Sequence, residues 1–218
     1  MRRTRKPDAE RTDDDAHNTH QHDTLLGHLG DVPAIREARR GRGERRGRRG
    51  QGIEANIDPA GQLDLSDDEA AVFDVVLAAQ HSRLRRNEDQ TERMIAAVAH
   101  PAVRILAHPR GRITGSRAGV IADWDAVFAA AAQRGVAIEI DGDPARQDID
   151  HTLAARALEA GCLFALDSDA HTADQLSFAE TAVAHARLAG IPADRIVNCW
   201  PVDRLLAWLS NPTSERRA

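Results

Sequence analysis

The stretch Leu163–Thr172, LFALDSDAHT, joins a short apolar run to a group of polar residues that includes Asp167, Asp169 and His171. The apolar residues predict a buried strand. Side chains of a strand alternate between its two faces, so Asp167 and Asp169 are expected on the same side. Carboxylates and an imidazole at the end of a buried strand indicate either a solvated turn or a set of metal ligands. The remainder of the chain bears on that choice.

The same arrangement recurs in other parts of the sequence. The apolar runs VVLAAQHS and VRILAHP lead into His81 and His108, and Glu54 follows Gly52 and Ile53. One histidine at the end of a strand is most often a structural residue held by hydrogen bonds. Four strands that each lead to a carboxylate or an imidazole indicate a shared site. Such ligands, without thiolate, suit zinc, manganese or iron bound for hydrolysis.

Segments with helical spacing separate these runs, and each lies between two predicted strands or follows the last one. Asp123 is placed to cap the helix that begins after it, Gly135 lies just past that helix, and Pro201 opens the last one. Strand and helix alternate five times, which predicts βα units around a parallel sheet, open or closed into a barrel. One predicted strand begins at Gly52 and leads to Glu54, and the others are 72–82, 103–109, 136–141, 162–171 and 195–200. The predicted helices are 91–101, 123–135, 152–161, 173–190 and 201–210.

Composition divides the chain into a segment at 1–50, a domain at 51–210 and a short tail at 211–218. The first segment is polar and carries eight arginines between Arg36 and Arg49, interleaved with glycine. It is expected to be disordered, because it cannot bury enough apolar surface to fold alone. A second interpretation is an arm that binds nucleic acid. Stacking on bases is not indicated, since no aromatic residue lies among the arginines. The net charge of −5 argues against a basic nucleic-acid binder as a whole.

Cysteine content and hydropathy limit the class of protein further. Cys162 and Cys199 are the two cysteines and form no CxxC pair, which predicts two core thiols and neither a disulfide nor a thiolate zinc site. The longest apolar runs are too short to span a bilayer. The first residues have no apolar segment of the secretory type, so the expected location is the cytoplasm and no membrane partner is expected.

Six motifs together resemble a known family. GIEANI, VVLAAQHS, ILAHPRGR, VAIEIDGDPARQD, LFALDSDAHT and RIVNCWP follow one another between residues 52 and 209. In that order they resemble the motifs of the polymerase and histidinol phosphatase (PHP) domain, and most closely those of the bacterial PHP proteins allied to family X DNA polymerases. The resemblance implies a distorted (βα)₇ barrel that holds up to three metal ions at its C-terminal mouth and hydrolyses phosphoesters.

The resemblance also implies a role for individual residues. Glu54 resembles the carboxylate that bridges two metals, and His81 and His108 resemble the histidines that complete one metal shell. Asp169 resembles a ligand of the neighbouring metal, and His171 a ligand of the third. The implied cofactor is therefore a divalent ion, namely zinc, manganese or iron, and the implied substrate is a phosphorylated small molecule or a nucleic-acid end.

Two arginines complete the predicted catalytic set with Glu54 and Asp169. Arg112 and Arg146 follow predicted strands and are candidates to hold phosphate oxygens. Salt bridges that stabilise their loops are the other interpretation of both residues.

The sequence departs from the family before Glu54. The family opens with a strand that carries His-x-His and a second strand that ends in Asp-His. Here His20 and His22 have that spacing, but no apolar strand leads into them. The barrel is therefore expected to be incomplete, with its first strands missing and one metal shell intact.

Three functions remain open at this point. The first is a metal-dependent phosphoesterase that hydrolyses a phosphate monoester or a nucleotide end with a metal-activated water. The second is a truncated PHP remnant with weak or no catalysis. The third is a nucleic-acid-binding protein that uses the Arg-rich arm. The sequence does not fix the oligomeric state.

Overall fold

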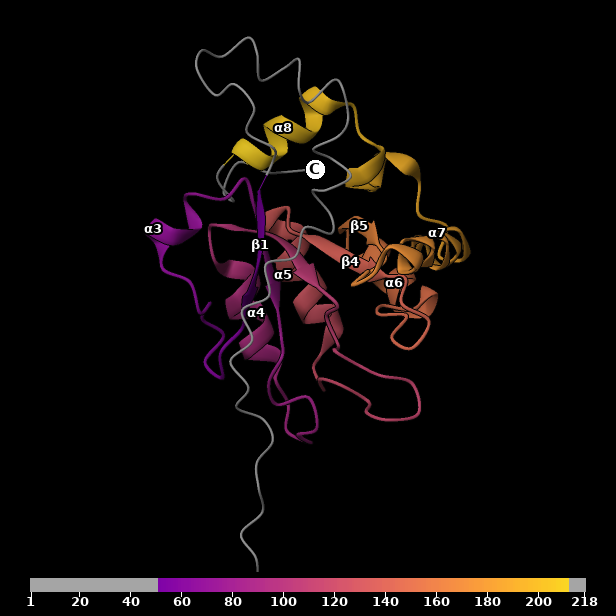
Figure 1. Ribbon diagram of the computed structural model, residues 1–218. Coiled ribbons are helices and arrows are strands. Elements are labelled where there is room, and N and C mark those ends of the chain that lie inside the picture. Colours follow the sequence, from indigo (N-terminus) through magenta and orange to yellow (C-terminus); the bar gives the residue numbers. More distant parts are fainter. Residues whose placement is uncertain (1–50, 212–218) are drawn as a thin grey trace, which may run out of the picture.

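The computed structural model describes residues 51–211, which form an α/β structure around one sheet (Figure 1). All five strands are parallel and follow the order β1-β2-β3-β4-β5. Neighbours in the sequence are therefore neighbours in the sheet, and the predicted α/β class with a parallel sheet is confirmed. His20, His22 and the arginines of 36–49 lie outside the described residues. The strands are β1 Gly52–Asn56, β2 Val75–Ala79, β3 Val103–Ala107, β4 Ala137–Asp141 and β5 Leu163–Asp167.

Helices connect the strands and have the ends that the sequence indicates. Asp123 caps α5 by accepting hydrogen bonds from the backbone N–H groups of Asp125 and Ala126, and Gly135 ends the helix with φ of 62°. The α-helices are α3 Asp67–Ala70, α4 Thr91–Ala99, α5 Trp124–Arg134, α6 His151–Glu159, α7 Ala179–Leu188 and α8 Val202–Ser210. None of the helices between residues 51 and 211 has the length and apolar character needed to cross a bilayer.

The two faces of the sheet pack against different helices. Ile138 and Phe164 belong to the core that includes the buried residues of α4, α5, α6 and α7. Ile105 and Ala137 have the opposite parity and pack with Leu205 and Trp208. In Figure 1 α8, in yellow, lies above the sheet and away from α4, α5 and α6. The second face is thus the one on which α8 packs, and it also carries the polar residues described below.

The predicted sixth strand at 195–200 is wrong. Two short 3₁₀ helices occupy this region, η2 Ala193–Arg195 and η3 Val197–Cys199, and one isolated bridge joins Ile196 to Phe164. The side chain of Asn198 replaces strand pairing, because its Oδ1 accepts from Leu166 N–H (2.8 Å) and its Nδ2 donates to Leu166 O (3.0 Å). One amide side chain therefore satisfies backbone groups at the edge of β5 that a strand would otherwise pair.

Two smaller expectations also need correction. The segment expected as one helix at 173–190 begins as a 3₁₀ helix, η1 Ala173–Phe178, and continues as α7. Thr172 and Gln175 form a capping box at its start, which fixes a tight first turn. Both cysteines are free, but Cys199 is exposed and only Cys162 is a core thiol.

Candidate metal centre

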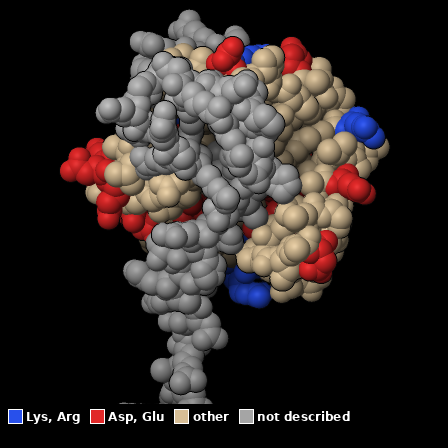
Figure 2. All heavy atoms as spheres, turned by 45° about the horizontal axis from the view of Figure 1, so that its top comes forward, with Lys and Arg blue, Asp and Glu red and all other residues tan. Residues whose placement is uncertain are grey.

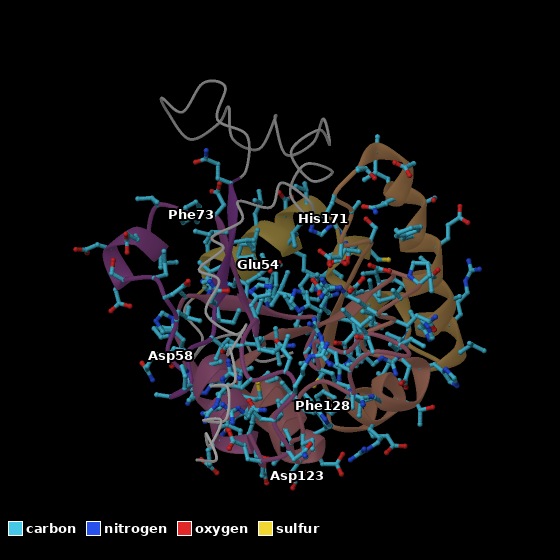
Figure 3. All side chains as sticks on the ribbon, turned by 60° about the horizontal axis from the view of Figure 1, so that its bottom comes forward. Glu54, Asp58, Phe73, Asp123, Phe128 and His171 are labelled. Atoms are coloured by element: carbon cyan, nitrogen blue, oxygen red, sulfur yellow. The ribbon has the colours of Figure 1, made fainter. Side chains whose placement is uncertain are left out.

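Polar side chains gather at the carboxyl ends of the strands, on the face opposite α4–α7. Glu54 lies within β1, two residues before its end, and is in register with Leu77 of β2. His81 follows β2 by two residues, and His108 comes directly after β3. Parallel strands bring their carboxyl ends to one edge of the sheet, so residues distant in sequence meet there. Glu54 can be located on β1 in Figure 3.

Glu54, His81 and His108 form a compact group of three potential metal ligands. The Nε2 atom of His81 lies 3.1 Å from Glu54 Oε1, and the Nε2 atom of His108 lies 3.4 Å from the same oxygen. One ligand atom from each residue falls within 4.8 Å of the other two. Atoms bound to one zinc ion at about 2.0–2.2 Å lie roughly 3–3.5 Å apart, so the spacing fits a shared divalent ion.

The electrostatics of this group favour a positive charge beside Glu54. Burial alone would raise the pKa of Glu54, but hydrogen bonds and charges of His108 and His81 outweigh it and hold that pKa well below its usual range. Burial would lower the pKa of His108, and the hydrogen bond and charge of Glu54 outweigh it and raise the pKa to about 9. Glu54 is therefore a buried carboxylate, 8% exposed, that stays ionised because His108 and His81 lie beside it.

His108 reaches the group through an unusual backbone conformation. Ile105 and Ala107 lie on the face of Glu54, so strict alternation would turn the next residue to the opposite face. The φ of His108 is 25°, which breaks the alternation. Two hydrogen bonds hold this strained residue, one from its N–H to the Glu139 carboxylate and one from the Gln80 side chain to its carbonyl. Strain that the surroundings maintain in this way is common at functional sites.

A second cluster consists of carboxylates at the ends of β4 and β5. Glu139 and Asp141 project from β4, and Asp141 is in register with Asp167. Burial raises the pKa of Asp141 to about 8, and the charge of Asp167 adds to the shift. Burial also raises the pKa of Glu139 well above its ordinary value, with the charge of Asp167 as the next cause. The raised pKa values show that these carboxyl groups are ionised at a cost, which the counter-charge of a neighbouring cation would lower.

Arg146 supplies part of this counter-charge. Its Nη2 lies 3.2 Å from Asp169 Oδ2, and its Nε lies 3.7 Å from Asp141 Oδ2. Burial would lower the pKa of Arg146, but the charges of Asp169 and Asp141 outweigh it and raise that pKa. Arg146, a predicted catalytic residue, is thus placed among carboxylates next to the candidate metal centre.

The structure does not bring Asp169 and His171 into the group of three. Among the described residues, Glu54, His81 and His108 are the only such set within 4.8 Å. Asp169 pairs with Arg146, although its charge still contributes to the raised pKa of His108. His171 is exposed in the loop after β5 (Figure 3), and its Nδ1–H donates to the backbone oxygen of Asp169 at 2.7 Å.

Arg112 makes the contacts of a loop-stabilising residue. Its Nε donates to the Arg146 carbonyl (2.7 Å), its Nη2 donates to the Gln147 carbonyl, and its Nη1 lies 3.0 Å from Asp150 Oδ2. These contacts join the loop after β3 to the loop after β4. Arg112 therefore supports the segment that carries Arg146.

Several polar residues of the site were missed in the sequence. Asn56 follows Glu54 by two positions, and Glu139 and Asp141 have the same spacing inside an apolar run. A spacing of two puts such pairs on one face of a strand, and polar pairs within an apolar strand are a usable signal. These residues lie within the strands, whereas the predicted ligands His81, His108, Asp169 and His171 follow them.

The surface charge on one side of the molecule is mixed. In Figure 2 acidic side chains gather at the edge formed by α3, whose first turn contains Asp67, Asp68 and Glu69. Basic side chains of the described residues appear on that view only at separated points. The described part of this face thus presents no continuous basic surface.

Comparison with known proteins gives a consistent set of relatives. No family model matches the chain. The DNA polymerase/3'-5' exonuclease PolX of Bacillus subtilis is 32% identical over 160 residues, which are 73% of this chain and 28% of the relative. A probable phosphatase of Shewanella halifaxensis is 34% identical over 170 residues, 73% of this chain and 66% of the relative. The probable phosphatase YcdX of Escherichia fergusonii is 33% identical over 171 residues, 74% of this chain and 67% of the relative. The chain spans about two thirds of the length of these phosphatases and about a quarter of the polymerase.

Proposed function

Because the chain belongs to the PHP family, we propose that it is a metal-dependent phosphoesterase that hydrolyses a phosphate monoester or a nucleic-acid end. The observation that carries the proposal is the convergence of Glu54, His81 and His108 within 4.8 Å at the carboxyl ends of three strands. A carboxylate and two imidazoles are the donor set of hydrolytic zinc, manganese and iron sites. The names of the relatives, a phosphatase and an exonuclease, agree with phosphoester chemistry.

The proposed architecture is a PHP barrel domain at residues 51–210. The five-stranded parallel sheet is compatible with part of a distorted (βα)₇ barrel, with β1 at one edge and β5 at the other. In this arrangement the face that carries Glu54 is the interior of the barrel. The candidate metal centre then lies at its C-terminal mouth, where βα barrels carry their chemistry.

Each residue of the site has a proposed role in holding the ion or the substrate. Glu54 provides the ionised carboxylate, and His81 and His108 provide the Nε2 lone pairs. A divalent ion bound there would lower the pKa of a coordinated water and withdraw charge from the phosphoryl group. Asp169 and His171 are proposed as further ligands, on the strength of their family positions alone. Arg146 lies beside Asp169 and can donate to phosphoryl oxygens, since a guanidinium retains several N–H groups after pairing.

A second candidate is a PHP protein with weak or no catalysis. One observation favours it, namely that Asp169 pairs with Arg146 and that residues 51–211 contain no second group of metal ligands around it. Such a protein would bind one ion and turn over little. The two candidates therefore differ in hydrolysis and agree on metal binding.

The test compares metal-dependent hydrolysis in the purified chain and in two histidine variants. Metal-free protein is loaded with zinc, manganese or iron and assayed with an aryl phosphate and with an oligonucleotide. His108→Ala removes a buried ligand, and His151→Ala removes an exposed histidine at the start of α6 as a matched control. The proposal expects turnover that requires metal, disappears in H108A and persists in H151A. Metal binding without turnover at any metal concentration would favour the second candidate.

A further inference from the structure

His81 is the exposed member of the metal group, yet its ring is held in one orientation. Its side chain is 42% exposed, compared with 3% for His108. On the side away from Glu54, its Nδ1 lies 2.5 Å from Asn56 Oδ1. Asn56 therefore holds the ring at Nδ1, while Glu54 contacts it at Nε2.

Asn56 is in turn fixed by Asp64. The Nδ2 of Asn56 donates to Asp64 Oδ2 at 2.5 Å, and the backbone N–H of Asn56 donates to Asp64 Oδ1 at 2.7 Å. The backbone of Asp64 also bonds to Asn56, because Asp64 N–H donates to Asn56 O at 3.0 Å. Both carboxylate oxygens of Asp64 therefore point at one residue of β1.

The local fold makes this pairing rigid. Asn56 ends β1 on the face of Glu54, and the loop that follows turns back so that Leu63 bridges Ile57. Gly61 in this loop has φ of 84°, and a Cβ atom there would approach Arg93 O to 2.5 Å. The loop therefore packs closely against α4. This packing places Asp64 beside the end of β1.

The hydrogen bonds that link Asp64, Asn56 and His81 allow only one assignment of donors and acceptors between these three residues. An ionised carboxylate can only accept hydrogen bonds, so the amide nitrogen of Asn56 must face Asp64. The amide oxygen then faces His81, and since it can only accept, Nδ1 of His81 must carry a proton. Nε2 is then the ring nitrogen left for a metal, which would replace its proton at the position 3.1 Å from Glu54 Oε1.

We propose that Asp64 and Asn56 are positioning residues that select the metal-binding tautomer of His81. Neither residue belongs to the three-ligand group, and both act through His81. The hydrogen bond at one ring nitrogen decides which nitrogen is available to a metal, and partners of this kind raise metal affinity. The inference rests on the proposed function only in taking a divalent ion as the ligand of His81.

An isosteric substitution tests the assignment, because it should reverse the direction of the hydrogen bonds that run from His81 through Asn56 to residue 64. In Asp64→Asn the oxygen must still accept from the Asn56 backbone N–H, so the new amide nitrogen faces the Asn56 side chain. Asn56 would then turn its own oxygen toward residue 64 and its nitrogen toward His81. Nδ1 of His81 would have to accept, and the proton would move to Nε2, where it blocks metal binding.

The control is Asp58→Asn in the same loop. Asp58 Oδ1 accepts backbone hydrogen bonds from Ala60 and Gln62, and the substitution removes the same charge without touching Asn56. Metal affinity is measured by competition with a chromogenic chelator, using zinc as the probe. The expected result is a loss of about 10–100-fold in D64N and a change of less than about threefold in D58N.

The second readout is the ¹⁵N chemical shift of His81 Nδ1 in metal-free protein. Nδ1 should be protonated in the wild type and in D58N, and unprotonated in D64N. If D64N does not fold, Asn56→Ala serves instead, with loss of the protonated Nδ1 expected. A protonated Nδ1 in D64N, or unchanged zinc affinity, would overturn the proposal.

These readouts separate the inference from the proposed function. The tautomer is observed without metal and without substrate. A wild type that binds zinc through the selected tautomer but does not hydrolyse phosphoesters would refute the proposed function and leave the inference intact. An active enzyme with unaltered zinc affinity in D64N would do the reverse.

Discussion

Arg93 is expected to be the residue of α4 whose loss most disturbs the loops after β1 and β2, beside the candidate metal centre. It is 5% exposed, and its guanidinium donates to the carbonyls of Asp58 (2.8 Å) and Ser82 (3.1 Å) and to Gln90 Oε1 (2.7 Å). It also donates to the carbonyl of Ile57 and to Ser82 Oγ at 3.0 Å. One buried cation therefore joins the loop after β1 to the loop after β2.

The cost of replacing Arg93 by glutamine follows from these contacts. A hydrogen bond to a charged group contributes about 1.5–3 kcal/mol, and such values do not add within one network. A buried acceptor left without a donor costs about 1–3 kcal/mol, so the loss of several donors at once, without full additivity, should cost about 3–5 kcal/mol. For a domain of this size each kcal/mol shifts Tm by about 2–4 °C, so R93Q should melt about 6–20 °C below the wild type.

The assay is differential scanning calorimetry of R93Q beside Arg156→Gln. Arg156 makes the same kind of contact at the surface, 2.9 Å from Asp125 with a side chain that is 46% exposed, and exposed pairs contribute about 0–1 kcal/mol. If the two variants melt within about 2 °C of each other, the network at Arg93 does not hold the loops and the reasoning is refuted.

Three further predictions concern other parts of the domain. Asn198→Ala removes both hydrogen bonds to Leu166 and should lower the free energy of unfolding in urea by about 1–2 kcal/mol, whereas an unchanged value would mean that water replaces the amide at no cost. Burial, and next the charge of His151, lower the pKa of His185 from its ordinary value, so the folded ring stays neutral while the unfolded one gains a proton below about pH 6.5. Stability from this residue is therefore lost as pH falls, and the advantage of wild type over His185→Gln in unfolding free energy should shrink toward acid pH; a constant difference would contradict this. Glu54→Gln keeps the shape of the side chain but removes its charge, and it should weaken zinc binding by at least about 100-fold in a chelator competition.

The parallel sheet could be predicted because its strands have a simple physical pattern. Short apolar runs such as VRILA, separated by capped helices, leave few alternatives to βα units. The run RIVNCW has the same composition but fails, since the fold satisfies the edge of β5 with the side chain of Asn198. Nothing in a local pattern indicates that an asparagine will replace a strand.

The candidate site could be predicted in part for a similar reason. His81 and His108 follow apolar runs, so their position at one edge of the sheet follows from parallel topology. The pairing of Arg146 with Asp169 joins loops after different strands and depends on tertiary structure. The conformation of His108, with φ of 25°, is equally invisible in the sequence because Glu139 and Gln80 maintain it from elsewhere.

The central claim is that Glu54, His81 and His108 hold a divalent ion. The most direct measurement is the metal content per chain after extensive dialysis, for the wild type and for His108→Ala, by plasma mass spectrometry. Three protein ligands with an open position predict about one zinc, manganese or iron ion per wild-type chain and essentially none in H108A. A wild type without metal, or an ion retained in full by H108A, would contradict the account.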